Sequence, residues 1–106
     1  MALDTSLETA DGTAKITLAG ELDASVAGQF QELIKEAAEH EPTKVVLFVE
    51  NLSFMASAGL RVLVFAKQHM GSEVDIYMIA PQEPIRETLE MSGFASAVYI
   101  QDTYEE

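Results

Sequence analysis

The sequence has no cysteine, no tryptophan and few basic residues. Without cysteine the chain can form neither a disulfide nor a thiolate metal site, and two histidines are its only imidazole ligands. Six Lys and Arg stand against eighteen Asp and Glu, so the net charge is −12. Because a nucleic-acid binder must neutralise phosphates with lysine and arginine, this charge argues against nucleic acid as a direct partner.

Long apolar runs are also missing from the chain. Its apolar segments are far shorter than the roughly 20 residues that cross a bilayer, and residues 1–4 lack the basic and apolar layout of a signal peptide. These absences predict a soluble cytoplasmic domain without membrane insertion. A chain of 106 residues has room for one domain, which we expect over residues 1–100, followed by a frayed acidic tail over 101–106.

Apolar residues that alternate with polar ones predict a β-hairpin around the Asp11-Gly12 turn. Two later apolar runs do not alternate, which favours strands buried on both faces. A short apolar stretch near the C-terminus predicts a last strand. The expected strands cover residues 3–7, 14–18, 45–49, 76–79 and 97–100.

Three amphipathic helices are predicted between these strands. Asp23 or Ser25 is the expected N-cap of the first helix, and the residue before Pro42 ends it. The second and third helices are expected over residues 58–70 and 84–92. The order β-β-α-β-α-β-α-β predicts an α/β fold with a single mixed sheet and helices packed on it.

The segment that opens the second helix holds the candidate chemistry. Ser57 stands at the expected N-cap, where the free amides that follow it and the positive end of the helix dipole can hold an anion. Gly59 leaves the backbone beside Ser57 unshielded. Residues 51–72 contain no Asp or Glu but do contain Arg61 and Lys67, so a phosphoryl group on Ser57 meets no like charge in the local sequence. An ordinary N-cap serine is the alternative explanation.

The second helix also offers a candidate protein-binding patch. Its core stripe is expected to include Leu63 and Val64. Phe65 falls on the other side with Arg61, near Met55 of the preceding loop, and an exposed apolar patch with a polar rim is typical of a surface that binds protein. Alternatively, Phe65 packs under another part of the chain.

Enzymatic and metal-binding interpretations of these residues fail on spacing. His69 follows Ser57 on the same predicted helix by about 18 Å at 1.5 Å per residue, which is too far for the base of a serine hydrolase. No Gly-Lys-Ser/Thr motif for a phosphate-binding loop is present. Glu36 and His40 are one helical turn apart but supply only two metal ligands. We therefore expect no enzyme activity, no cofactor and no metal site.

Three motifs resemble those of bacterial anti-sigma factor antagonists, which are single STAS domains. Residues 18–23, Leu-Ala-Gly-Glu-Leu-Asp, are similar to the family's Gly-Glu-Leu-Asp turn. Residues 52–60 resemble its phosphorylation loop, and residues 91–94, Met-Ser-Gly-Phe, resemble its signature before the last strand. The resemblance covers nearly the whole chain and implies a STAS-like fold.

The resemblance also implies a partner-switching function. In this family, the serine at the position of Ser57 is phosphorylated by a partner anti-sigma factor that is a serine kinase. The unphosphorylated form binds that kinase and frees a sigma factor. Phosphorylation ends the binding, and a serine phosphatase that acts on the phosphorylated form restores it. The residues that we expect to contact the partner are Asp23, Met55, Ala56, Ala58, Gly59, Arg61 and Phe65.

One residue departs from the family pattern. Family members commonly carry Asp immediately before the serine, where this chain has Ala56. The change removes a negative charge beside the phosphate acceptor. The alternative function is therefore a STAS module that is not phosphorylated and that serves as a scaffold in a sensory complex or binds a small apolar ligand.

Overall fold

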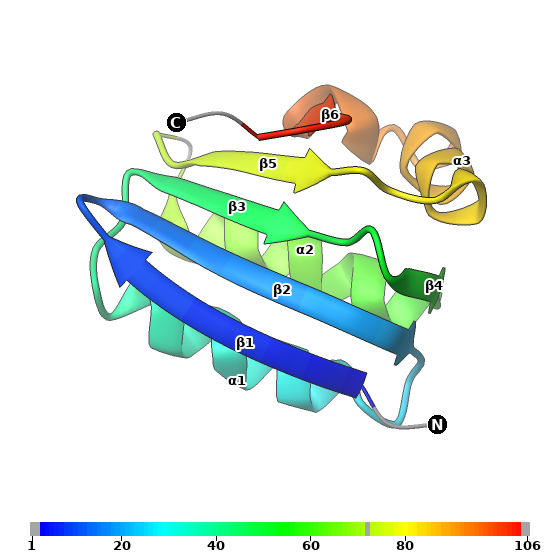
Figure 1. The fold of residues 1–106 in the computed structure, drawn as a ribbon, viewed down its shortest axis with the longest axis horizontal. Helices are drawn as coiled ribbons and strands as arrows, with labels where there is room; N and C mark the ends of the chain where they lie inside the picture. Colours follow the sequence, from blue (N-terminus) through cyan, green and yellow to red (C-terminus); the bar gives the residue numbers. More distant parts are fainter. Residues whose placement is uncertain (1–2, 72, 105–106) are drawn as a thin grey trace.

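The sheet is built around a long hairpin (Figure 1). In the computed structural model, which describes residues 3–71 and 73–104, β1 (Leu3–Ala10) pairs antiparallel with β2 (Thr13–Leu22). Asp11 and Gly12 form the turn with φ of 52° and 79°, the left-handed values that a two-residue hairpin turn requires at both positions. The predicted hairpin is therefore confirmed.

Parallel strands extend the sheet from β2. They are β3 (Lys44–Phe48), β5 (Asp75–Ile79) and β6 (Tyr99–Gln101), in the order β1-β2-β3-β5-β6. A further strand, β4 (Leu52–Met55), was not predicted. It pairs with β2 beyond the point where β3 leaves it, since Leu22 lies opposite Met55.

Helices cover one face of the sheet. In Figure 1 α1 (Ala27–Ala38) and α2 (Ser57–Met70) lie next to each other behind the strands, and the two helices contact each other. The third helix, α3 (Glu83–Met91), packs against β4, and a 3-10 turn (Phe94–Ala97) leads into β6. No helix in the described part of the chain is long and apolar enough to cross a membrane.

The core lies between the sheet and the helices α1 and α2. Phe30 and Ile34 of α1 and Leu63 of α2 are fully buried against it, together with Ile16 and Leu47 of the sheet. Burying such side chains contributes roughly 1.5 to 3 kcal/mol each. The prediction that the third strand is buried on both faces is also confirmed.

Residues 101–104 were expected to belong to a frayed tail, but in the structure they pack on the sheet. The last strand, β6, begins at Tyr99, two residues later than predicted, and extends to Gln101. The Gln101 carbonyl accepts a hydrogen bond of 2.7 Å from the Ala80 amide. Tyr104 packs edge-on against Phe48 on the face of the sheet opposite α1 and α2. Residues 105–106 lie outside the described part of the chain.

Candidate functional site

The two segments that carry the site, at Asp23 and Ser57, come together at the ends of β2 and β4. Parallel pairing sets Leu22 opposite Met55, and the Ala56 amide donates a hydrogen bond of 2.9 Å to the Leu22 carbonyl. Because Asp23 directly follows Leu22, its turn lies beside the first turn of α2. The pairing of β2 with β4 therefore brings the Asp23 turn and Ser57 together.

Ser57 is the first residue of α2, and Ala56 is its N-cap. The prediction that Ser57 is the N-cap is wrong by one residue. Its side chain is exposed and makes no hydrogen bond to any other residue that the structure describes. The hydroxyl is therefore accessible from solvent and has no role in holding the helix end.

The amides at the start of α2 are less available than expected. Gly59 N and Leu60 N donate to the Ala56 carbonyl at 2.9 and 3.2 Å, because the helix begins one residue earlier than predicted. Two of the amides that were expected to be free are thus occupied. An anion on Ser57 is stabilised instead by the positive end of the helix dipole, which contributes about 0.3 to 1 kcal/mol at an exposed position.

Gly59 is buried and lets α2 approach the strands closely. A Cβ at this position would lie 2.7 Å from Leu22 Cγ and 3.0 Å from Met55 Cγ. Met55 itself is only 6% exposed. Gly59 and Met55, which were expected to contact a partner, therefore form the underside of the site and offer no side-chain surface.

The exposed face of α2 differs from the expected one. Phe65 is half-buried against the core and stacks on His69 at 5.0 Å, so the predicted exposed Phe65 patch is wrong. Val64, predicted to be in the core, is 37% exposed, and Phe54 of β4 is 47% exposed. Ala56 and Ala58 are half-buried beside Ser57. We call the surface formed by the half-buried Asp23 and the exposed Phe54, Ser57, Arg61 and Val64 the α2 face.

Comparison with known proteins decides the family. The family model for the STAS domain matches residues 4–106. The chain belongs to the STAS domain family.

This STAS domain is similar to several anti-sigma factor antagonists. It is 26% identical over 83 residues to the anti-sigma-F factor antagonist RsfB of Mycobacterium tuberculosis, which covers 78% of this chain and 68% of RsfB. A crystal structure of an anti-sigma factor antagonist from Mycobacterium paratuberculosis matches with a TM-score of 0.87 at 22% identity, over 96% of this chain and 87% of the other.

SpoIIAA, an anti-sigma factor antagonist from Bacillus, also has the same fold. Its unphosphorylated form matches with a TM-score of 0.76 at 22% identity, over 95% of this STAS domain and 90% of SpoIIAA. Its phosphorylated form matches with a TM-score of 0.73 at 24% identity, over 92% of this STAS domain and 90% of SpoIIAA.

Arg61 is the unpaired cation on the α2 face of this STAS domain. It lies one helical turn after Ser57, and within residues 3–71 and 73–104 its guanidinium makes no hydrogen bond or ion pair. Lys67, the other cation of α2, is engaged, because its Nζ donates to the Val74 carbonyl at 2.9 Å. Arg61 is therefore the cation that α2 presents to solvent next to Ser57.

Asp23 organises the turn beside Ser57. Its Oδ1 accepts hydrogen bonds from the Ser25 hydroxyl at 2.6 Å and from the Ser25 amide at 3.0 Å. The hydroxyl bond lowers the pKa of Asp23 below its usual value of 3.8, so the carboxylate is ionised at neutral pH. The expected capping of α1 by Asp23 or Ser25 is wrong, since Val26 is the N-cap and no side chain caps the helix.

The described residues contain no group of three or more His, Asp or Glu side chains that could hold a metal ion. The α2 face thus presents one carboxylate, one guanidinium, one hydroxyl and two exposed apolar side chains. This combination of apolar and polar groups is suited to binding a protein surface.

Proposed function

We propose that this STAS domain is an anti-sigma factor antagonist. It binds an anti-sigma factor that is a serine kinase through the α2 face, and the binding releases a sigma factor. It is a binding protein, and the chemistry of the switch belongs to the kinase and to a serine phosphatase. The similarity to RsfB and SpoIIAA supports the antagonist role.

The observation that carries the proposal is the setting of Ser57. Its hydroxyl is exposed and unbonded in the described structure, and the sequence around it, residues 51–72, has no Asp or Glu in a chain of net charge −12. A kinase can reach such a hydroxyl without unfolding the helix. The existence of a phosphorylated form of SpoIIAA supports phosphorylation within this fold.

Phosphorylation of Ser57 ends the binding by changing the charge of the α2 face. A phosphoryl group adds about −1.5 to −2 charges at neutral pH. It would stand in the centre of the partner contact, next to the ionised Asp23 turn, and would have to be desolvated in the complex. Removing such a charge from water costs far more than an ordinary surface contact contributes.

The switch can be tested with purified proteins. The chain is incubated with ATP and each anti-sigma kinase of its host, and the phosphorylated residue is identified by mass spectrometry. Phosphorylation is expected in the wild type and in Ser53→Ala, a nearby exposed serine, and is expected to be lost in Ser57→Ala. Ser57→Asp should weaken binding to the kinase at least about tenfold, as measured by calorimetry, in line with the charge argument.

One pair of results would overturn the switch. If no kinase modifies the chain and Ser57→Asp binds its partner as the wild type does, the domain acts as a binding module without phosphorylation. Ala56, which leaves no carboxylate directly before Ser57, is the feature that would then explain the loss of kinase recognition.

A further inference from the structure

The open face of the sheet, opposite α1 and α2, is covered by the C-terminal segment. The Tyr104 ring lies 6.1 Å from Phe48 and 6.0 Å from Tyr77, between centroids, and meets both edge-on. Side chains of a strand alternate between faces, so Lys44, Val46 and Phe48 of β3 share this open face. Val46 has no exposed surface although no described helix lies over it.

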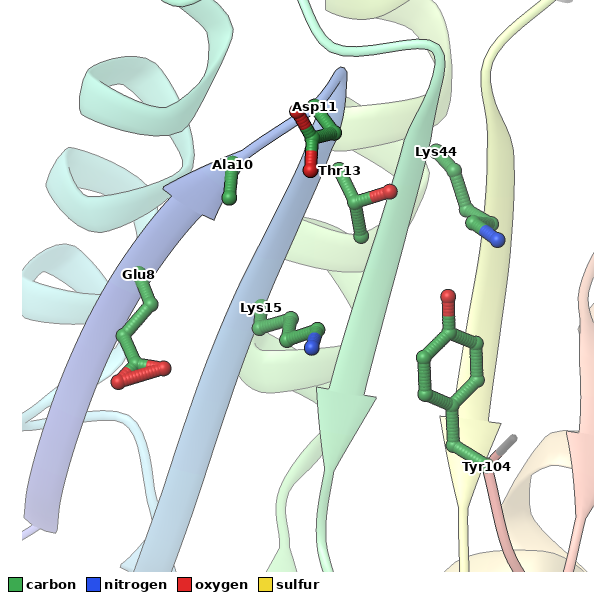
Figure 2. A pocket seen from close by; sticks show the side chains of 7 residues that line it. All are labelled: Glu8, Ala10, Asp11, Thr13, Lys15, Lys44 and Tyr104. Atoms are coloured by element: carbon green, nitrogen blue, oxygen red, sulfur yellow. The ribbon is translucent and has the colours of Figure 1, made fainter. Parts of the chain in front are cut away.

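Lys15 and Lys44 both contact the ring of Tyr104. Lys44 Nζ lies 5.0 Å and Lys15 Nζ 5.8 Å from the centre of the Tyr104 ring, within the range of cation–π attraction. A hydrogen bond with Tyr104 is also the main cause that raises the pKa of Lys44. Figure 2 shows the two lysine side chains, from β2 and β3, reaching toward the tyrosine.

The cleft continues beyond the ring. A volume of about 390 Å³ lies beside Tyr104. Its other lining residues are Lys44 of β3 and, from the hairpin, Glu8, Ala10, Asp11, Thr13 and Lys15 (Figure 2). The lining carries both signs of charge, from Glu8 and Asp11 and from Lys15 and Lys44. The two lysines attract a carboxylate, and the two acids of the hairpin repel it.

Besides the contacts of its ring, the part of the C-terminal segment that the structure describes beyond β6, residues 102–104, forms an ion pair. Asp102 forms an ion pair of 3.7 Å with Arg86, but its side chain is 92% exposed. Exposed ion pairs of this kind contribute about 0 to 1 kcal/mol. Among residues 102–104, the Tyr104 ring is therefore the main anchor, and a segment of the same chemistry can compete with it.

We propose that this open face is a second docking surface, which binds an acidic segment with an aromatic anchor from a partner protein, and that residues 102–104 occupy it in the free chain. The occupant is inferred from the segment that the structure seats there. In it the Tyr104 ring lies within cation–π range of Lys15 and Lys44, and Asp102, which pairs with Arg86, precedes the ring. The surface lies on the other side of the sheet from the α2 face, so this proposal does not depend on Ser57.

The test uses a fluorescent peptide with the sequence of residues 101–106, Gln-Asp-Thr-Tyr-Glu-Glu. Fluorescence anisotropy should show that the 106-residue chain with Tyr104→Ala binds it at least about tenfold more tightly than the wild type. The reason is that the attached tail competes in the wild type at an effective concentration on the order of millimolar. NMR shift changes should map to Lys15, Phe48 and Tyr77.

Matched variants separate docking from general effects. Tyr99→Ala removes a tyrosine that stacks on Tyr77, and no ring contact joins it to Tyr104 in the described residues. The tail should therefore stay docked, and the peptide should bind as weakly as it does to the wild type. Adding Lys15→Gln and Lys44→Gln to Tyr104→Ala should abolish peptide binding. A peptide in which alanine replaces the tyrosine should not bind either.

Two results would overturn the proposal. The first is equal affinity of Tyr104→Ala and the wild type for the peptide, or shift changes away from the open face. The second is a wild-type dimer in sedimentation velocity that Tyr104→Ala dissociates, because the occupant would then be the tail of a second copy. Neither result bears on the phosphorylation of Ser57, which is measured separately.

Discussion

At the residue scale, the candidate site depends most closely on Gly59. Its missing side chain allows the first turn of α2 to rest on Leu22 and Met55, the two residues that pair where β2 and β4 end. The same contact positions Ser57 above the sheet with its hydroxyl in solvent. Gly59 thus acts through packing, whereas its sequence position suggested a role in exposing backbone to an anion.

The substitution Gly59→Ala is predicted to destabilise the chain. The new Cβ would lie 2.7 Å from Leu22 Cγ, so the helix or the strand must shift. Overpacking of this kind costs about 1 to 3 kcal/mol of the free energy of unfolding, which a urea titration measures.

Gly28→Ala in α1 is the matched control. A Cβ at Gly28 meets no atom within 4 Å, and φ there is not positive. Replacing this helical glycine should raise the free energy of unfolding by about 0.5 to 1 kcal/mol. Equal effects of the two substitutions would contradict the packing role of Gly59.

At the element scale, α2 is rotated by one residue relative to the face predicted from its apolar pattern. Its buried positions are Gly59, Val62, Leu63 and Ala66, which follow the spacing of a helix face. A glycine does not register as apolar in a hydrophobic pattern, so the pattern favoured the neighbouring stripe. The rotation brings Val64 out and turns Phe65 toward the core.

This rotation predicts opposite effects for two neighbouring substitutions. Val64→Asn should weaken binding to the anti-sigma factor severalfold and leave the free energy of unfolding within about 0.5 kcal/mol of the wild type, as is usual for surface sites. Phe65→Ala should lower the free energy of unfolding by about 1 to 3 kcal/mol, because it removes a ring that packs on the core. Calorimetry and urea titration measure the two quantities, and a reversed pattern would show that Phe65 is the surface residue.

At the scale of the whole molecule, the sheet separates two surfaces. The α2 face lies where β2 ends, at Leu22, and the docking surface for Tyr104 lies on the opposite face, near Lys15 in the first half of β2. The two surfaces share no residue. The chain has a net charge of −12 and only six basic residues, and each surface presents some of these six. Arg61 lies on the α2 face, and Lys15 and Lys44 lie at the docking surface.

Substitutions at the two surfaces should therefore act independently. Arg61→Ala is expected to weaken binding to the anti-sigma factor, and Tyr104→Ala is expected to leave it unchanged. In the double variant, the two effects should add within about 0.5 kcal/mol, as for distant sites without shared partners. A double-mutant cycle on the calorimetric affinity measures this coupling, and a value above about 1 kcal/mol would indicate that the tail communicates with the α2 face.

The sequence by itself determined the hairpin, the three helices, the buried strands and the placement of Ser57 at the start of a helix. These features follow from local backbone geometry, because turn residues and the periods of strand and helix are set within a few neighbouring residues. The motif resemblance also pointed to the STAS family before any contact was known.

Only the tertiary structure decided which surfaces meet. β4 has four residues with no alternating pattern, and it becomes a strand because β2 extends past β3 and offers it unpaired backbone groups. The rotation of α2 depends on Leu22 and Met55 lying under Gly59, and the place of Tyr104 depends on lysines and aromatic rings from three other strands. Such contacts join residues far apart in the chain, so no local period encodes them.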